Sequence, residues 1–278
     1  MNKSDKWTGE RLETFVFNET TIEHLHRYAI AAEFVRGKKV LDIACGEGYG
    51  SHLLAQSAGM VTGMDKDPDT IRKAAEKYRR ENLHFMPGLI ESIPLATGQF
   101  DIIVSFETLE HIEEQDKAVA EMKRLLAPGG LLLISTPDKK NYSSDPTGLN
   151  PWHKKELTAS EFSELLSNYF KFISIAGQDL LTTSVISMDG ASGLKYYGGD
   201  FNQVRALDKI EPLYLIAFCS DDERVRPPSS LFLGKSILER SFSEKETAVR
   251  NTMTYRLGHF ILYPVKYIRY LFKKTPVK

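Results

Sequence analysis

The residues best suited to chemistry lie where an apolar run ends in a loop of small residues. Residues 40–43 form the apolar run, and Ala44, Gly46 and Gly48 follow it before an expected helix. Small residues allow tight backbone turns and leave space beside the main chain, and the start of a helix offers free N–H groups. A dinucleotide fingerprint would need a third glycine where this chain has Ser51. The loop therefore predicts a ligand that lies against the backbone, and it argues against a pyrophosphate.

A carboxylate at the end of the next apolar run fits the same ligand. Residues 60–64 form this run, and Asp65 and Lys66 follow it, about 20 residues beyond Gly46, the spacing at which an acidic residue meets a ribose in nucleotide-binding sheets. A carboxylate in this place can accept two hydrogen bonds from a ribose diol. The sequence therefore predicts a nucleoside cofactor at the loop.

Three segments carry a family resemblance. Asp42-x-Ala44-x-Gly46-x-Gly48 resembles the first motif of class I S-adenosylmethionine-dependent methyltransferases, with Ala44 in place of the usual first glycine. Residues 100–111 and 125–135 resemble the fourth-strand motif of that family and the segment that enters its fifth strand. The resemblance implies an α/β, Rossmann-like class I methyltransferase fold, with a seven-stranded, mostly parallel sheet whose last strand is antiparallel and with helices on both faces. It also implies S-adenosyl-L-methionine as the cofactor.

The resemblance assigns cofactor roles to the loop and to the acidic residue beyond it. Ala44 and Gly46 would let the methionyl part and the ribose lie against the loop, and Asp42 and Gly48 complete the motif. Asp65 would bind the ribose hydroxyls. The alternatives are a turn that simply needs small residues and, for Asp65, a polar cap at the end of a strand.

Further cofactor contacts are expected from other segments. Leu89 stands where many family members carry an Asp that contacts the adenine amino group, so adenine recognition is expected to depend on the backbone near Ile90 and on apolar contacts. Ser105 and Phe106 would lie beneath the methionine moiety, where a backbone carbonyl can meet its amino group. Arg27 is similar in placement to an arginine that grips the cofactor carboxylate in related enzymes, and the alternative is a solvated helix arginine.

The expected chemistry is in-line displacement, because a sulfonium-bound methyl group is already electrophilic. The protein must hold the acceptor and remove the proton of an acceptor hydroxyl. His111 is the first candidate base and His153 the second; the alternative for His111 is a histidine at a helix start, bonded to backbone. Glu107 and Glu110 could orient His111 or bind acceptor hydroxyls. No HxH pair, HxxxH pair or carboxylate cluster in the sequence indicates a catalytic metal, so none is predicted.

The sequence indicates the methyl acceptor less specifically than the methyl donor. Residues 8–11, 24–28, 150–157 and 256–258 resemble segments of methyltransferases associated with bacterial surface-glycan biosynthesis. The resemblance implies O-methylation of a sugar hydroxyl on a nucleotide- or lipid-linked glycan in surface polysaccharide biosynthesis. The alternatives are a soluble small molecule, such as a quinone precursor or a natural product, and a scaffold that binds the cofactor without turnover.

Composition narrows the class of protein. The chain of 278 residues is long enough for one large α/β domain with appendages. Its 36 basic and 37 acidic residues nearly cancel, which argues against a nucleic-acid partner. Two cysteines suggest neither a disulfide framework nor a Cys/His metal site, and the first residues lack the apolar core of a signal peptide. A cytoplasmic protein is therefore expected.

Apolar periodicity predicts the order of the elements. An N-terminal helical cap, residues 1–37, is expected over the cofactor cleft, and the methyltransferase domain is expected at 38–221 with an acceptor-side lid at about 181–212. Strands alternate with helices, which predicts a parallel sheet. The expected strands are 39–43, 60–64, 83–86, 101–106, 131–136, 170–176 and 213–220. The expected helices lie near 51–58, 68–79, 114–126 and 158–168.

Residues 222–278 are expected to form a basic, amphipathic, helical extension. Residues 247–278 contain no acidic side chain, and Pro264 can begin a helix with Val265, Ile268, Leu271 and Phe272 on its apolar face. Such a face can lie on the anionic inner surface of a membrane, or it can pack on its own domain or on a second subunit as a homodimer.

Overall fold

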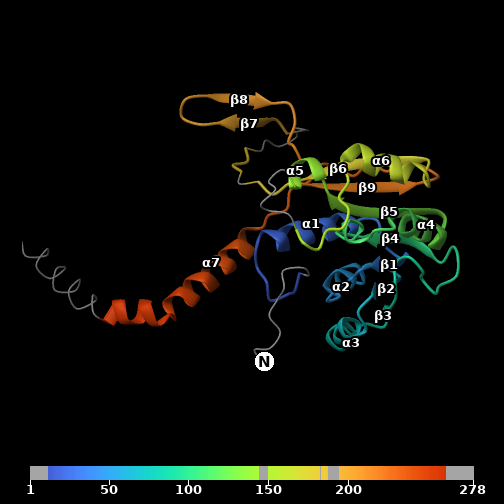
Figure 1. The fold of residues 1–278 in the computed structure, drawn as a ribbon, viewed down its shortest axis with the longest axis horizontal. Helices are drawn as coiled ribbons and strands as arrows, with labels where there is room; N and C mark the ends of the chain where they lie inside the picture. Colours follow the sequence, from blue (N-terminus) through green and yellow to red (C-terminus); the bar gives the residue numbers. More distant parts are fainter. Residues whose placement is uncertain (1–11, 144–149, 182, 187–193, 261–278) are drawn as a thin grey trace, which may run out of the picture.

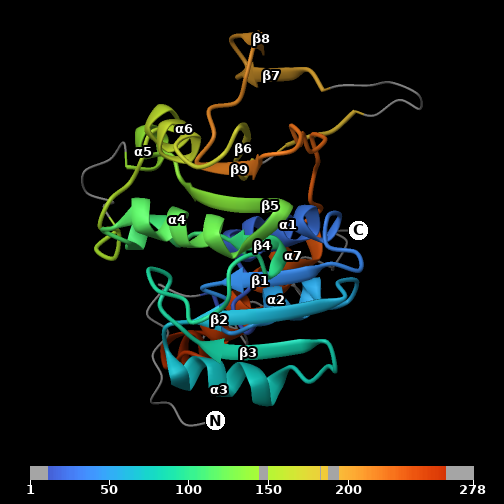
Figure 2. The same cartoon turned by 90° about the vertical axis from the view of Figure 1, so that its right-hand side faces the viewer.

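A single seven-stranded sheet forms the centre of the molecule. The computed structural model describes residues 12–143, 150–181, 183–186 and 194–260. The sheet has the strand order β3-β2-β1-β4-β5-β9-β6, with β3 at one edge and β6 at the other (Figure 2). Its strands are β1 (Lys39–Ile43), β2 (Met60–Asp65), β3 (Leu83–Pro87), β4 (Phe100–Ser105), β5 (Leu126–Pro137), β6 (Phe172–Gln178) and β9 (Tyr214–Ser220).

The register of the strands confirms the expected sheet. β1 pairs in parallel with β2 and β4, while β9 runs antiparallel to both β5 and β6. Successive side chains of a strand point to opposite faces, so each apolar strand supplies both halves of the core. In β1, Leu41 and Ile43 enter one buried cluster and Val40 enters the other. The parallel strands end at the same edge, and ligands of open α/β sheets bind outside that edge.

Helices cover both faces of the sheet (Figure 1). α1 (Glu19–Ala32) and α2 (Tyr49–Leu54) pack on the Val40 face, and α4 (Gln115–Leu125) and α6 (Ala159–Ser167) pack on the Leu41 face. α3 (Pro68–Lys77) lies against β2 and β3, and the short α5 (Lys139–Tyr142) follows β5. The sequence prediction of a Rossmann-like sheet with helices on both faces is confirmed.

Local capping signals explain where the helices begin. Asn18 and Thr21 form a reciprocal capping box at the start of α1, and Thr158 and Glu161 form one at the start of α6. Pro68 stands in the first turn of α3, where the N–H that it lacks has no partner within the helix. These side chains satisfy N–H groups that a helix leaves unpaired at its start.

Two parts of the chain lie outside the main sheet and the helices that cover it. Within the predicted lid, β7 (Tyr196–Gly199) and β8 (Val204–Leu207) form an antiparallel hairpin that stands apart from the main sheet (Figure 1). After β9, α7 (Lys235–Arg250) leads away from the domain. The helix predicted to begin at Pro264 lies outside the described residues. In the described part of the chain, no helix is both long and apolar enough to span a membrane.

Candidate active site

The loop after β1 forms one wall of a cavity of about 310 Å³ at the carboxyl edge of the sheet. Ala44 and Gly46 both have positive φ, of 57° and 52°, and Ala44 is one of few non-glycine residues in this conformation. A side chain at Gly46 would meet no atom within 4 Å, so the loop faces open space here. Strained backbone of this kind occurs where a ligand approaches the main chain.

Eight of the residues predicted from the sequence line this cavity. They are Ala44, Gly46, Asp65, Lys66, Leu89, Ile90, Glu107 and His111. The cavity is also lined by residues that were not predicted, namely Ile43, Met64, Gly88, Glu91, Thr108, Ile112 and Lys154. Thr108 and Ile112 are close to His111 in the sequence, so the prediction of His111 could have included them. Lys154 lies in a loop far from His111 in the sequence, and only the fold brings it to the cavity.

Asp65 is held in place by the backbone of its neighbours. Its Oδ2 accepts a hydrogen bond from the Gly46 N–H at 3.1 Å, and its Oδ1 accepts one from the Asp67 N–H at 3.0 Å. A carboxylate oxygen can accept more than one hydrogen bond, so this anchoring still permits contacts with hydroxyl groups of a ligand. The anchored carboxylate and the open space beside Gly46 face the same cavity.

Asp42 supports the loop from behind and does not line the cavity. Its carboxylate is fully buried and accepts hydrogen bonds from the Ser51 hydroxyl at 2.6 Å and the Tyr28 hydroxyl at 3.1 Å. Burial raises the pKa of Asp42 to about 7, although the hydrogen bonds from Ser51 and Tyr28 act to lower it. Asp42 was predicted to be a cofactor-binding residue, but in this structure it supports the loop and does not face the cavity.

Gly48, Ser105 and Phe106 also lie outside the cavity lining. Gly48 has φ of 85° at the start of α2, and a Cβ there would lie 2.8 Å from the Phe85 ring, so only glycine fits. Ser105 is fully buried, and Phe106 packs edge-on against Tyr28 with ring centroids 5.3 Å apart. The predicted cofactor contacts of Gly48, Ser105 and Phe106 are therefore not direct contacts with this cavity.

Arg27 is buried at 1% exposure and reaches from α1 toward Glu107. Its Nε donates to the Gln178 Oε1 at 2.7 Å, and its guanidinium lies over the Tyr214 ring at 4.7 Å. Nη1 lies 3.5 Å from the Glu107 Oε1, and neither terminal nitrogen has a hydrogen-bond partner among the described residues. A buried guanidinium with unmet donors fits a ligand carboxylate, as the sequence resemblance implied.

Two acidic side chains, Glu107 and Glu110, lie near His111, and of these two Glu107 lines the cavity. Glu107 has φ of 49°, and its Oε1 accepts from the Ser135 hydroxyl at 2.6 Å. Glu110, in the short 3₁₀ helix η1 (Leu109–His111), is 1% exposed, and its Oε2 accepts from the Thr136 hydroxyl at 3.4 Å. Burial and the Glu107 charge raise the pKa of Glu110 well above its usual range.

The two candidate bases lie side by side, with ring centroids of His111 and His153 5.1 Å apart. His111 Nδ1 lies 2.9 Å from the Trp152 carbonyl oxygen, and its Nε2 lies 3.8 Å from the Glu110 Oε1. His153 is 7% exposed, with Nδ1 2.5 Å from the Glu156 Oε1. Only His111 lines the cavity. The structure therefore brings together two residues that are 42 positions apart, a contact that no local pattern predicted.

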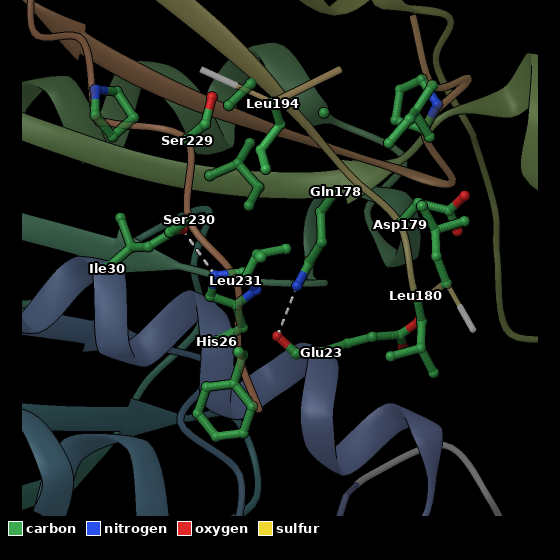
Figure 3. Close-up of a pocket in the computed structure, with 18 of the residues that line it drawn as sticks. Glu23, His26, Ile30, Gln178, Asp179, Leu180, Leu194, Ser229, Ser230 and Leu231 are labelled. Atoms are coloured by element: carbon green, nitrogen blue, oxygen red, sulfur yellow. Dashed lines mark hydrogen bonds between the residues drawn. The ribbon is translucent and has the colours of Figure 1, made fainter. Parts of the chain in front are cut away.

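A second cavity, of about 500 Å³, lies beside α1 (Figure 3). It is bounded by α1, by the ends of β6 and β9 and by residues 227–232. Gln178 lines this second cavity; its Oε1 accepts from Arg27, and its Nε2 donates to the Glu23 carbonyl at 2.9 Å. Leu194 and Tyr196 of the predicted lid line this second cavity and not the first.

Comparison with known proteins agrees with this geometry. Residues 41–134 match the protein family described as Methyltransferase domain. A probable S-adenosylmethionine-dependent methyltransferase of Mycolicibacterium smegmatis is 37% identical over 162 residues, covering 57% of this chain and 62% of the relative. A ubiquinone biosynthesis O-methyltransferase of Haemophilus ducreyi is 33% identical, covering 36% of this chain and 45% of the relative. The chain thus spans about three fifths or less of the length of these relatives.

The arrangement of the sheet is that of solved methyltransferases. A SAM-dependent methyltransferase of Thermotoga maritima superposes with a TM-score of 0.52 at 13% identity, covering 73% of this chain and 90% of that one. The chain has the class I methyltransferase fold. For the matched part of the chain, the comparisons confirm the predicted enzyme class, a methyltransferase, and the predicted cofactor, S-adenosylmethionine.

Proposed function

We propose that this protein transfers a methyl group from S-adenosylmethionine to a hydroxyl group of an acceptor. The observation that carries the proposal is the cavity at the carboxyl edge of the sheet, where the anchored Asp65 carboxylate, the open Gly46 backbone and the wall formed by Glu107 and His111 meet. The match of residues 41–134 to a methyltransferase domain supports the same chemistry.

The residues present fit the cofactor. Asp65 would bind the ribose hydroxyls, the backbone at Gly46 would leave room for the ribose, and Leu89 and Ile90 would contact the adenine. Arg27 has unmet donors for the carboxylate of the methionine part. When bound, this cofactor supplies an electrophilic methyl group, so the chain has to orient the acceptor and manage its proton.

The wall formed by Glu107 and His111 would receive the acceptor hydroxyl. A hydroxyl oxygen must lose its proton as the new bond to carbon forms, and a positioned base contributes on the order of 10²- to 10⁴-fold. The prediction from sequence that His111, or else His153, is that base stays a prediction. The position of His111 in the cavity lining supports His111 over His153.

For the acceptor we propose a sugar hydroxyl of a nucleotide- or lipid-linked glycan. Support comes from the resemblance of residues 24–28 and 150–157 to glycan-associated methyltransferases. A phenolic quinone precursor is the second candidate, favoured by the similarity to a ubiquinone biosynthesis O-methyltransferase.

A turnover assay with the purified full chain tests the proposal. Release of S-adenosylhomocysteine is measured with activated sugars and with catechol-type phenols as acceptors, and calorimetry measures binding of S-adenosylmethionine and of NAD. We expect S-adenosylmethionine to bind more tightly than NAD and turnover to favour sugars. Turnover with phenols alone would show that the acceptor is a phenol and not a sugar. Cofactor binding without any turnover would indicate a scaffold, and tighter NAD binding would overturn the proposal.

A further inference from the structure

Glu110, His111 and His153 form a compact group of potential metal ligands beside the cofactor cavity. One ligand atom from each of the three lies within 4.8 Å of the other two. The group is built by backbone contacts, because the N–H groups of Lys154 and Lys155 both donate to the Glu110 carbonyl, at 2.8 and 3.1 Å. These bonds tie the loop that carries His153 to η1. Two imidazoles and one carboxylate are a donor set found in open, three-ligand metal sites.

Each imidazole is oriented as a metal ligand would be. His111 Nδ1 lies 2.9 Å from the Trp152 carbonyl oxygen, which can only accept, so Nδ1 carries the proton and Nε2 offers a lone pair. His153 Nδ1 lies 2.5 Å from the Glu156 carboxylate, which assigns its proton in the same way. Metal-binding histidines usually donate their second N–H to a carbonyl or carboxylate, which fixes the tautomer and the ring orientation.

Two further features of the group favour a cation, and one contact would have to change. Nε2 of His111 lies 3.8 Å from the Glu110 Oε1, so these two atoms face each other. Nε2 of His153 lies 3.0 Å from the Asn150 Nδ2, and this amide would have to turn away for a metal to bind. Glu110 is 1% exposed, and a cation would compensate the cost of burying its carboxylate.

We propose that Glu110, His111 and His153 bind one divalent transition-metal cation. Imidazole ligands favour Zn²⁺, Cu²⁺, Fe²⁺ or Ni²⁺ over Mg²⁺, Ca²⁺ and Mn²⁺, which prefer oxygen. No local motif in the sequence indicates this site, because His111 belongs to η1 and His153 to a loop 42 positions further along the chain. His111 lines the cavity, so the cation would be adjacent to it, with coordination positions open to a further oxygen ligand.

The role of the cation in catalysis rests on the proposed function, whereas its binding does not. An acceptor hydroxyl that coordinates the cation would become more acidic. Its proton would pass to water or to the Glu107 carboxylate. The oxygen would then form a bond to the methyl carbon as the carbon–sulfur bond breaks, and the electron pair would stay on sulfur. His111 would in this case be a ligand and not the base.

Cobalt titration of the full chain tests the proposal. Protein stripped with a chelator is titrated with Co²⁺, and binding is followed by calorimetry and by the visible absorption of the bound ion. We expect one equivalent to bind. His111→Ala, His153→Ala and Glu110→Gln should each weaken binding by about tenfold or more. Glu156→Gln, which alters only the orienting carboxylate, should weaken it by about ten- to a hundredfold. His84→Ala, on the exposed side of β3, is the matched control.

Two results would overturn the metal site. One is the absence of stoichiometric Co²⁺ binding to the wild-type chain. The other is binding that remains unchanged in the folded His111, His153 and Glu156 variants, with folding checked by circular dichroism. Full turnover in the stripped protein would remove the catalytic role of the cation and leave the methyltransferase proposal intact. Failure of the stripped and the reloaded protein alike to bind S-adenosylmethionine would instead contradict the proposed function.

Discussion

The contacts of Asp65 allow its contribution to cofactor binding to be predicted. Its carboxylate is held by two backbone N–H groups, so its orientation is fixed before any ligand arrives. Charge-assisted hydrogen bonds to ribose hydroxyls are worth about 1.5–3 kcal/mol. Asp65→Ala should therefore weaken S-adenosylmethionine binding by roughly ten- to a hundredfold, measured by calorimetry.

The matched control for Asp65→Ala is Asp69→Ala, which removes an exposed carboxylate from the first turn of α3. This variant should bind the cofactor as the wild type does. A folded Asp65→Ala protein with unchanged affinity would show that the ribose lies elsewhere.

The residues of the site differ in how readily the sequence predicts them. Ala44, Gly46 and Asp65 belong to short motifs at the ends of strands, so local pattern and sheet geometry together place them at one edge. The support of Arg27 by Gln178, 151 positions away, depends on tertiary packing. The same holds for the approach of His153 to His111. Pattern identifies which residues reach the site, and only the folded chain shows their partners.

Glu23 gives a prediction for the dependence of stability on pH. Burial raises its pKa to about 7 from 4.5, with Arg27 acting in the opposite direction and Glu107, Tyr214 and Asp179 nearby. Between these two pH values the folded protein keeps a proton that the unfolded chain has lost. The free energy of unfolding therefore falls as pH rises through this window, by at most about 1.4 kcal/mol per pH unit.

Replacement of Glu23 by glutamine should remove this contribution, because the amide does not ionise. The difference in Tm between pH 5 and pH 8 should become smaller in Glu23→Gln than in the wild type, with about 2–4 °C expected per kcal/mol. Part of the wild-type slope should remain, since Asp42 also has a pKa raised to about 7 by burial. Scanning calorimetry provides the measurement, and Glu19→Gln, exposed on the same helix, is the control. Equal slopes in all three proteins would contradict the assignment.

Among the elements, the seven strands of the main sheet were predicted and the β7–β8 hairpin was not. Each main strand is an apolar run with a clear end, whereas half of residues 196–207 are polar or glycine, and these residues form strands by pairing with each other. β8 is exposed along its whole length. Whether the insertion acts as a lid over the acceptor stays a prediction.

Removal of the hairpin tests the role of this element. We expect a variant in which a Gly-Ser link joins Lys195 to Asp208 to fold and to bind S-adenosylmethionine with unchanged affinity, because residues 196–207 do not line the cofactor cavity. If the insertion covers the acceptor, KM for the acceptor should rise while cofactor affinity stays constant. Steady-state kinetics at saturating cofactor measures KM for the acceptor, and calorimetry measures the affinity for the cofactor. Loss of cofactor binding in a folded variant would mean that the hairpin supports the first cavity.

At the scale of the whole molecule, the methyltransferase domain and α7 are connected by few contacts. α7 touches α1, and the Arg240 guanidinium lies over the Phe17 ring at 3.6 Å, but the helix then leads away from the domain (Figure 1). Beyond its first turns the described part of the extension exposes large apolar side chains, including Phe242, Val249, Met253 and Phe260. An extension of this kind is typical of a segment that contacts another surface.

The last prediction concerns what that surface is. If the basic extension lies on an anionic membrane, each basic residue near the surface contributes about 1 kcal/mol, and salt screens the attraction. The full chain should then sediment with vesicles that contain phosphatidylglycerol at low salt, and less so at high salt, while a chain lacking residues 264–278 should stay in solution. If the extension packs on protein, the truncation should instead lower the Tm or change the oligomeric mass, measured by light scattering, and neither chain should bind vesicles. Negligible sedimentation of both chains at both salt concentrations would eliminate the membrane alternative, because the electrostatic attraction is strongest at low salt.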